Sequence, residues 1–186
     1  LSVTVEGVVT ARKFNGFFVQ TAVGAEDGDP ASSEGLFVFT SSAPAAAAQP
    51  GRLVRITGTV AEYVPGADPG SAPLTELTFV TAITDQGAAV IPAPALLTPA
   101  DVSAAGGLDQ LERFEGMRVS AASLTAVSGT AGNTDENDAL GLSDGTFYAV
   151  LTGEARPFRE PGIEAGYLVL PCAAAPAPCN IPAFDG

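Results

Sequence analysis

The chain has 186 residues, of which 46% are hydrophobic, so it can bury a core and is not a disordered tail. It carries 21 acidic residues, eight Lys or Arg and no His, which gives a net charge of −13 at pH 7. This charge repels polyanions, and the lack of His excludes Ser–His–Asp catalysis. The acidity itself is typical of a soluble protein in an extracellular or salt-rich setting.

The first half reads as short strands separated by turns rich in Gly, Pro and Asp. β-branched and aromatic residues are concentrated in five stretches, several with period-two alternation: residues 3–12, 16–21, 35–40, 53–60 and 75–83. Asn15 and Gly16 suit a tight turn with positive φ between the first two stretches. Gly58, inside the fourth, indicates a bulge or a sharp corner. The pattern predicts a small closed β-barrel over residues 1–90.

A linker with a short helix is predicted for residues 91–116. Thr98 is a good N-cap and Pro99 fits the first helical position. Leu108, Leu111 and Phe114 are three residues apart, as on a short amphipathic turn that ends at Gly116.

β character resumes in residues 117–155, for which we predict a second β unit. Strands are expected at 117–127 and 140–153, with a hairpin turn at Asp144–Gly145 and a polar loop at 131–138. The remaining residues, 156–186, form a Pro-rich tail.

The only two cysteines, Cys172 and Cys179, flank a Pro-rich loop in this tail. A zinc site usually needs four ligands from Cys and His, and the chain has no others. The pair therefore predicts a disulfide and an oxidising compartment, with two free thiols in a cytosolic protein as the alternative. No run of about 20 apolar residues is present, so no membrane-spanning helix is expected. We interpret the chain, which does not begin with Met, as a domain of a longer secreted or cell-surface precursor.

Several segments, in order along the chain, resemble the OB-fold-like module that precedes the endonuclease/exonuclease/phosphatase-type catalytic domain of large secreted bacterial nucleases. In the first half these are EGVVT (6–10), GFFVQ (16–20), DGDPASSEGLFVF (27–39) and VRITGTV (54–60). In the second half they are LERFEGMRV (111–119), RPFREPGI (156–163) and IPAFDG (181–186).

The resemblance implies an all-β fold, an OB-fold-like barrel followed by a second, possibly OB-like unit. The catalytic centre of that family uses a His with acidic residues around a divalent metal, and this chain has no His. The resemblance therefore implies a non-catalytic accessory module, not an enzyme. Its expected partners are the nuclease or phosphatase catalytic domain and single-stranded nucleic acid, with no membrane.

Candidate ligand residues lie on the first strands, where bases stack in OB-folds. The aromatics of residues 17–18 and 37–39 fit either a core or a stacking role, and alternation places Phe17 and Phe18 on opposite faces. The few cations cluster on the same strands. The predicted ligand-binding set is Arg12, Lys13, Phe18, Gln20 and Arg55.

No cofactor is required by the sequence. Asp27 with Asp29, and Asp135 with Asp138, are candidate Ca²⁺ ligands or else solvated turns; neither stretch fits an EF-hand. A carboxylate pair for glycoside hydrolysis stays open. The alternative function is a structural or protein-interaction module of an extracellular protein, without affinity for nucleic acid.

Overall fold

A computed structural model describes residues 1–64, 66, 72–102, 110–127, 132–135, 140–143 and 149–154. Within these residues the protein is β-rich and contains no α-helix, only two 3₁₀ turns, η1 (Pro99–Val102) and η2 (Glu112–Phe114). No described segment has the helical length and hydropathy that crossing a bilayer would require.

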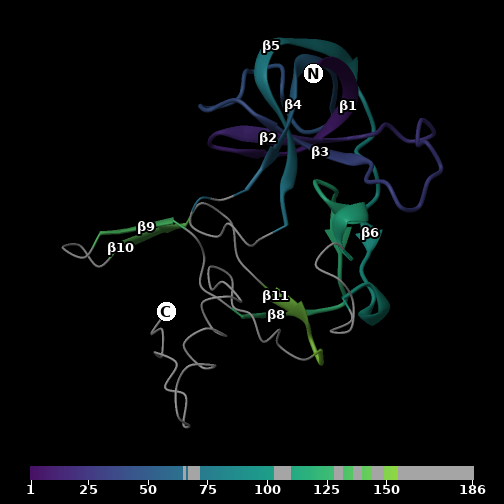
Figure 1. Cartoon of the computed structure of the whole chain (residues 1–186), viewed down its shortest axis with the longest axis vertical. Helices are drawn as coiled ribbons and strands as arrows, with labels where there is room; N and C mark the ends of the chain where they lie inside the picture. The colour runs from purple at the N-terminus through teal and green to yellow at the C-terminus, as the bar shows by residue number, and fades with distance from the viewer. Residues whose placement is uncertain are drawn as a thin grey trace, which may run out of the picture. The chain divides into compact units, whose positions relative to one another are not determined.

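Five strands close on themselves in the order β1-β2-β3-β5-β4, and we call this sheet the ring (Figure 1). They are β1 (Ser2–Lys13), β2 (Gly16–Gln20), β3 (Gly35–Phe39), β4 (Arg52–Tyr63) and β5 (Leu74–Ala88). All neighbours are antiparallel except β3 and β5, which pair in parallel at only two positions, Phe37↔Glu76 and Val38↔Leu77. The five predicted strands are confirmed.

The core fills the interior of the ring, as the alternation predicts. Phe17 and Val19 point inward from β2, and Val38 opposes Phe17 across β3. Ala48, in the Ala-rich segment between β3 and β4, is fully buried in the same cluster without forming a helix. The complete buried cluster is Val9, Phe17, Val19, Val38, Ala48, Val54, Ile56 and Leu77.

The turn between β1 and β2 differs from the prediction. Lys13 pairs with Gly16, so the turn residues are Phe14 and Asn15, and neither Asn15 nor Gly16 has positive φ. Glycine is needed at position 16 for space, because a Cβ there would lie 2.4 Å from Cζ of Phe37.

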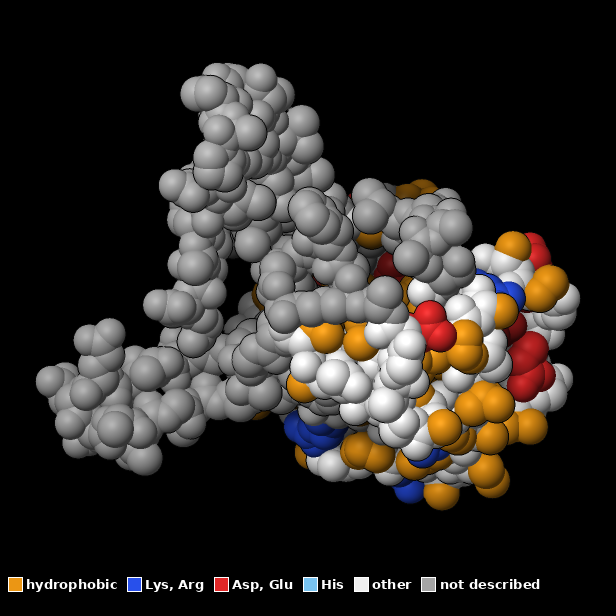
Figure 2. All heavy atoms as spheres, turned by 90° about the horizontal axis from the view of Figure 1, so that it is seen from below, with side chains coloured by type: hydrophobic (Ala, Val, Ile, Leu, Met, Phe, Trp, Pro, Cys, Tyr) orange, Lys and Arg blue, Asp and Glu red, His pale blue; other side chains and the backbone are white. Residues whose placement is uncertain are grey.

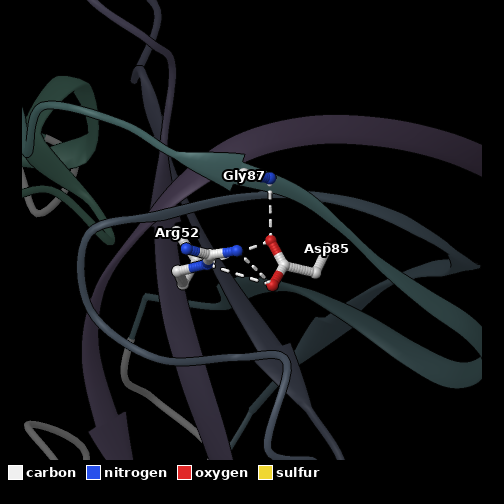
Figure 3. Close-up of polar contacts among 3 residues, drawn as sticks. All are labelled: Arg52, Asp85 and Gly87. Atoms are coloured by element: carbon white, nitrogen blue, oxygen red, sulfur yellow. Dashed lines mark hydrogen bonds and ion pairs between the residues drawn. The ribbon is translucent and has the colours of Figure 1, made fainter.

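Gly58 lies at the predicted bulge. The register between β4 and β5 shifts from Thr57↔Ala82 to Thr59↔Thr78, so three residues of β5 oppose this one glycine. Further along the same pair of strands, the guanidinium of Arg52 faces the carboxylate of Asp85, with N···O distances of 2.6–3.0 Å (Figure 3). Asp85 also accepts a hydrogen bond from the amide of Gly87.

The compact unit that contains the ring comprises Leu1–Tyr63 and Pro73–Ala122, and so extends past residue 90. It includes a short parallel pair, β6 (Ala95–Leu96) with β7 (Val119–Ser120). Where the predicted helical region is described, it forms turns: η1 begins at Pro99, with the Thr98 hydroxyl donating to Asp101, and η2 ends two residues before Gly116. Residues 103–109 lie outside the described residues.

The second unit comprises Val64–Ala72 and Ser123–Gly186. Its described strands are β8 (Leu124–Ala126), β9 (Gly132–Asp135), β10 (Leu140–Ser143) and β11 (Ala149–Leu151). β9 pairs with β10, and β8 with β11. The predicted hairpin turn at Asp144–Gly145 lies outside the described residues. The predicted polar loop at 131–138 is wrong in part, since half of it forms β9.

Candidate functional site

The outer face of β2 and β3, which the sequence predicts to hold a ligand, is largely buried. Phe18 opposes Phe37 across the two strands, and their ring centroids are 4.9 Å apart. Phe37 is 6% exposed and Gln20 is 5% exposed, although alternation turns both away from the core. Phe17 is fully buried and Phe18 is half-buried, which agrees with the prediction that the two side chains lie on opposite faces. Such burial on an outer face requires a cover.

Residues 112–118, which we call the latch, supply hydrogen bonds to this face. The backbone amide of Arg118 donates to Oε1 of Gln20 at 3.1 Å. The hydroxyl of Ser33 donates to the carbonyl oxygen of Glu115 at 2.6 Å. The amide of Thr75, at the start of β5, donates to Oε1 of Glu115, also at 2.6 Å. The latch is thereby bonded to β2, to the loop that precedes β3 and to β5.

Local interactions shape the latch for this role. Its 3₁₀ turn is closed by the amide of Phe114 bonding to the carbonyl of Leu111, and that of Glu115 to Glu112. Gly116 follows with φ of +67°, a left-handed conformation that glycine adopts without a steric cost. Arg113 lies over the Phe114 ring, 4.6 Å from its centroid, and pairs with Asp101. The turn therefore presents the backbone of residues 115–118 to the ring.

A cavity of about 600 Å³ lies on this side of the ring, with the latch forming part of its wall. Its apolar lining includes Val5, Val19 and Leu36, and its polar lining includes Gln20, several hydroxyls and four carboxylates. The acidic residues are Glu6, Glu34, Glu112 and Glu115, and no Lys or Arg is in the lining. This cavity favours cationic or hydroxyl-bearing groups and disfavours phosphate.

Glu115 has the most strongly shifted carboxyl group at this site. Desolvation by burial raises its pKa from 4.5 to about 7, against the opposing effect of the Thr75 hydrogen bond. The negative charges of Glu112 and Glu62 raise it further. Burial likewise raises the pKa of Glu76, which is 8% exposed and lies opposite Phe37 on the same outer face.

The five predicted ligand residues do not form one site. Phe18 and Gln20 lie on β2, whereas Arg55 lies on β4, between Glu6 of β1 and Thr84 of β5, and pairs with Glu6 at 3.3 Å. Arg12 and Lys13 end β1, and Nη2 of Arg12 donates to the carbonyl of Pro44 at 2.7 Å. Gln20 is hydrogen-bonded to the latch. The five predicted ligand residues therefore lie in three separate places: on β2, on β4 and at the end of β1.

The first calcium candidate is a hydrogen-bonded loop. Asp27 accepts from the amide of Asp29 and the hydroxyl of Ser32, which together lower its pKa, and Asp29 accepts from the amide of Ala31. No group of three or more metal-ligating side chains occurs among the described residues. For Asp135 only the backbone is described, and Asp138, Cys172 and Cys179 lie outside the described residues.

Sequence reasoning missed Ser33, Thr75 and Glu115 as contact residues. For the segment around Gly116 the sequence predicts a short turn and a resemblance, but no contact with the ring; a glycine between charged and apolar residues is the available sign of a tight approach. No family model, curated protein or solved structure matches the chain.

Proposed function

We propose that the chain is a non-catalytic, OB-fold-like module of a secreted nuclease, and that it positions the catalytic domain. The strand order β1-β2-β3-β5-β4, with the parallel contact between β3 and β5, supports an OB-fold. The ordered motif resemblance supports the nuclease context, and the absence of His supports a role without chemistry of its own.

The observation that carries the proposal is the latch. OB-folds bind their ligands on the β2–β3 face, and here Gln20 and Ser33 on or beside that face hold residues of the same chain. A face already bonded to protein is suited to fixing the path of the chain between domains. The net charge of −13 and the acidic cavity are consistent with this protein-directed role.

A titration tests this role directly. The full chain is mixed with a separately expressed endonuclease/exonuclease/phosphatase-type catalytic domain of the family it resembles, and complex formation is followed by calorimetry and by melting temperature. We expect saturable binding and a raised melting temperature. Absence of both would contradict the proposal.

Two Gln variants show whether the latch matters for that complex. Gln20→Leu removes the acceptor for the Arg118 amide, so it should loosen the latch and weaken the complex. Gln86→Leu changes an exposed glutamine on β5 and is the matched control. Equal affinity of both variants would remove the latch from the account.

The second candidate is a structural or interaction module outside any nuclease. The acidic lining of the cavity favours it, because such a lining suits a basic group of a partner protein. A complex that forms with a basic peptide but not with the catalytic domain would favour this candidate.

An extracellular location is part of the proposal and rests on the two cysteines. Thiol labelling of the unfolded protein should modify neither Cys172 nor Cys179 before reduction and both after it. Labelling without reduction would contradict an oxidising compartment. A melting temperature that does not change with Ca²⁺ or EDTA would dispose of a calcium role for Asp27 and Asp29.

A further inference from the structure

Phe79 has an unusual combination of strain and exposure. Its φ is +47°, a conformation that is rare for a bulky residue, and it is 79% exposed. It lies in the β5 bulge opposite Gly58, where the strand register shifts. Strained residues of this kind persist only where the surrounding structure holds them, and they gather at ligand-binding sites. The bulge places an aromatic ring in solvent instead of in the core.

A second cavity, of about 410 Å³, lies beside this ring. β3 and β5 pair only as far as Val38 and Leu77, and the cavity opens where the two strands diverge. Phe39 and Phe79 line it from the two sides. The remaining lining is apolar or hydroxylic: Thr40, Ser41, Ala45, Thr78, Val80 and Ile83. Unlike the first cavity, it contains no carboxylate.

The segments around this cavity are free of acidic residues. Residues 35–61 and 77–84, which include the whole lining, contain no Asp or Glu, and their two cations, Arg52 and Arg55, pair with Asp85 and Glu6. Residues 7–25 also lack acidic residues and contain Arg12 and Lys13. In Figure 2, hydrophobic side chains with Lys and Arg among them gather along the lower edge of the described surface, apart from most acidic ones. The lining of this cavity therefore carries no negative charge of its own.

Arg12 and Lys13 do not line the cavity, but each is connected to a lining residue through one intermediate residue. Arg12 bonds to the carbonyl of Pro44, whose neighbour Ala45 is in the lining. Lys13 pairs with Gly16, which in turn pairs with Phe39. We define the acid-free end as this cavity together with Arg12 and Lys13.

We propose that the acid-free end binds single-stranded nucleic acid, with a base stacked on Phe79 and phosphates near Arg12 and Lys13. Aromatic rings bind bases of any sequence by stacking, and nearby cations contact the backbone. Double-stranded DNA keeps its bases stacked on each other, so it does not offer them to Phe79. This inference goes beyond the proposed function, because it places substrate contact away from the β2–β3 face and needs no catalytic domain.

Fluorescence anisotropy with a short labelled oligo(dT) tests the inference on the full chain at low salt. We expect saturable binding that weakens as salt rises. Phe79→Gly should reduce affinity by about tenfold or more while keeping the fold, since glycine accepts the positive φ. Phe79→Trp should retain binding. Val90→Gly, at another exposed apolar residue outside the ring strands, is the control and should bind as the parent.

The electrostatic part has its own readout. Arg12→Ala should lower the slope of log affinity against log salt by about 0.7, the value for one contact to single-stranded nucleic acid. An abasic oligonucleotide of equal length should bind more weakly than oligo(dT) if stacking contributes. The inference is overturned if oligo(dT) does not bind, if the abasic strand binds equally well, or if Phe79→Gly binds as the parent. None of these outcomes bears on the latch or on complex formation with a catalytic domain.

Discussion

Gly35 and Gly116 lie backbone against backbone, 81 positions apart in the chain: a Cβ added at Gly35 would come within 2.4 Å of the carbonyl carbon of Gly116. Gly116 is equally restricted, because its own Cβ would lie 2.8 Å from the amide nitrogen of Leu36. Only two glycines allow β3 and the latch to approach this closely. The contact explains why the latch follows the β2–β3 face.

Gly35→Ala should therefore destabilise the protein by about 1–3 kcal/mol, the usual cost of forcing a methyl group into a packed site. Chemical denaturation of parent and variant measures this change. Gly66→Ala is the control, since nothing lies within 4 Å of a Cβ there. Equal destabilisation by the two substitutions would show that the Gly35–Gly116 contact is not tight.

Stability should fall as pH rises from about 4.5 to about 7, owing to Glu115. Its pKa is raised in the folded state from 4.5 to about 7, so the folded protein holds this proton more tightly than the unfolded chain does. The contribution is complete below the unfolded pKa and is lost as pH passes the folded one. Glu115→Gln should flatten this part of the profile of unfolding free energy against pH.

Glu26→Gln, in the exposed loop after β2, is the control for that profile. It should leave the pH dependence as in the parent. The account of Glu115 is contradicted if its variant shows the same slope as the parent between these two pH values.

Phe17→Ala should destabilise the protein by about 3–5 kcal/mol, because Phe17 is fully buried in the ring and its loss leaves a cavity. Phe14→Ala, three residues earlier and 66% exposed, should change stability little. Urea denaturation of both variants compares them. Similar losses would mean that the inward face of β2 is assigned wrongly.

Asp85→Asn should destabilise the protein only slightly, although Arg52 and Asp85 form a well-aligned pair. Both side chains are just over a third exposed, at 38% and 34%, and solvent screens their attraction. The loss should shrink further at high salt. A large loss that is insensitive to salt would contradict this interpretation.

The strands of the ring were predictable because their signals are local. Alternation in residues 53–60 and the Gly-rich turns need only neighbouring residues to be read. The faces of Phe17 and Phe18 follow from the same period of two. Local signals failed in the second unit, where β11 pairs with the more distant β8 and where β9 forms in a stretch that reads as a polar loop.

The latch and the acid-free end were not predictable for the same physical reason. The contact between Gln20 and Arg118 spans 98 positions, and that between Ser33 and Glu115 spans 82. No period or turn residue encodes such a separation. Phe79 lies in a run that reads as an ordinary strand, and its exposure results from a register shift between β4 and β5.

The central claim, that the β2–β3 face holds the latch, is tested most directly by amide hydrogen exchange on the full chain. The Arg118 amide, bonded to Gln20, and the Thr75 amide, bonded to Glu115, should exchange much more slowly than that of the exposed loop residue Val23. In Gln20→Leu the protection at Arg118 should fall. If Arg118 exchanges as fast as Val23 in the parent protein, the latch does not cover this face and the account is contradicted.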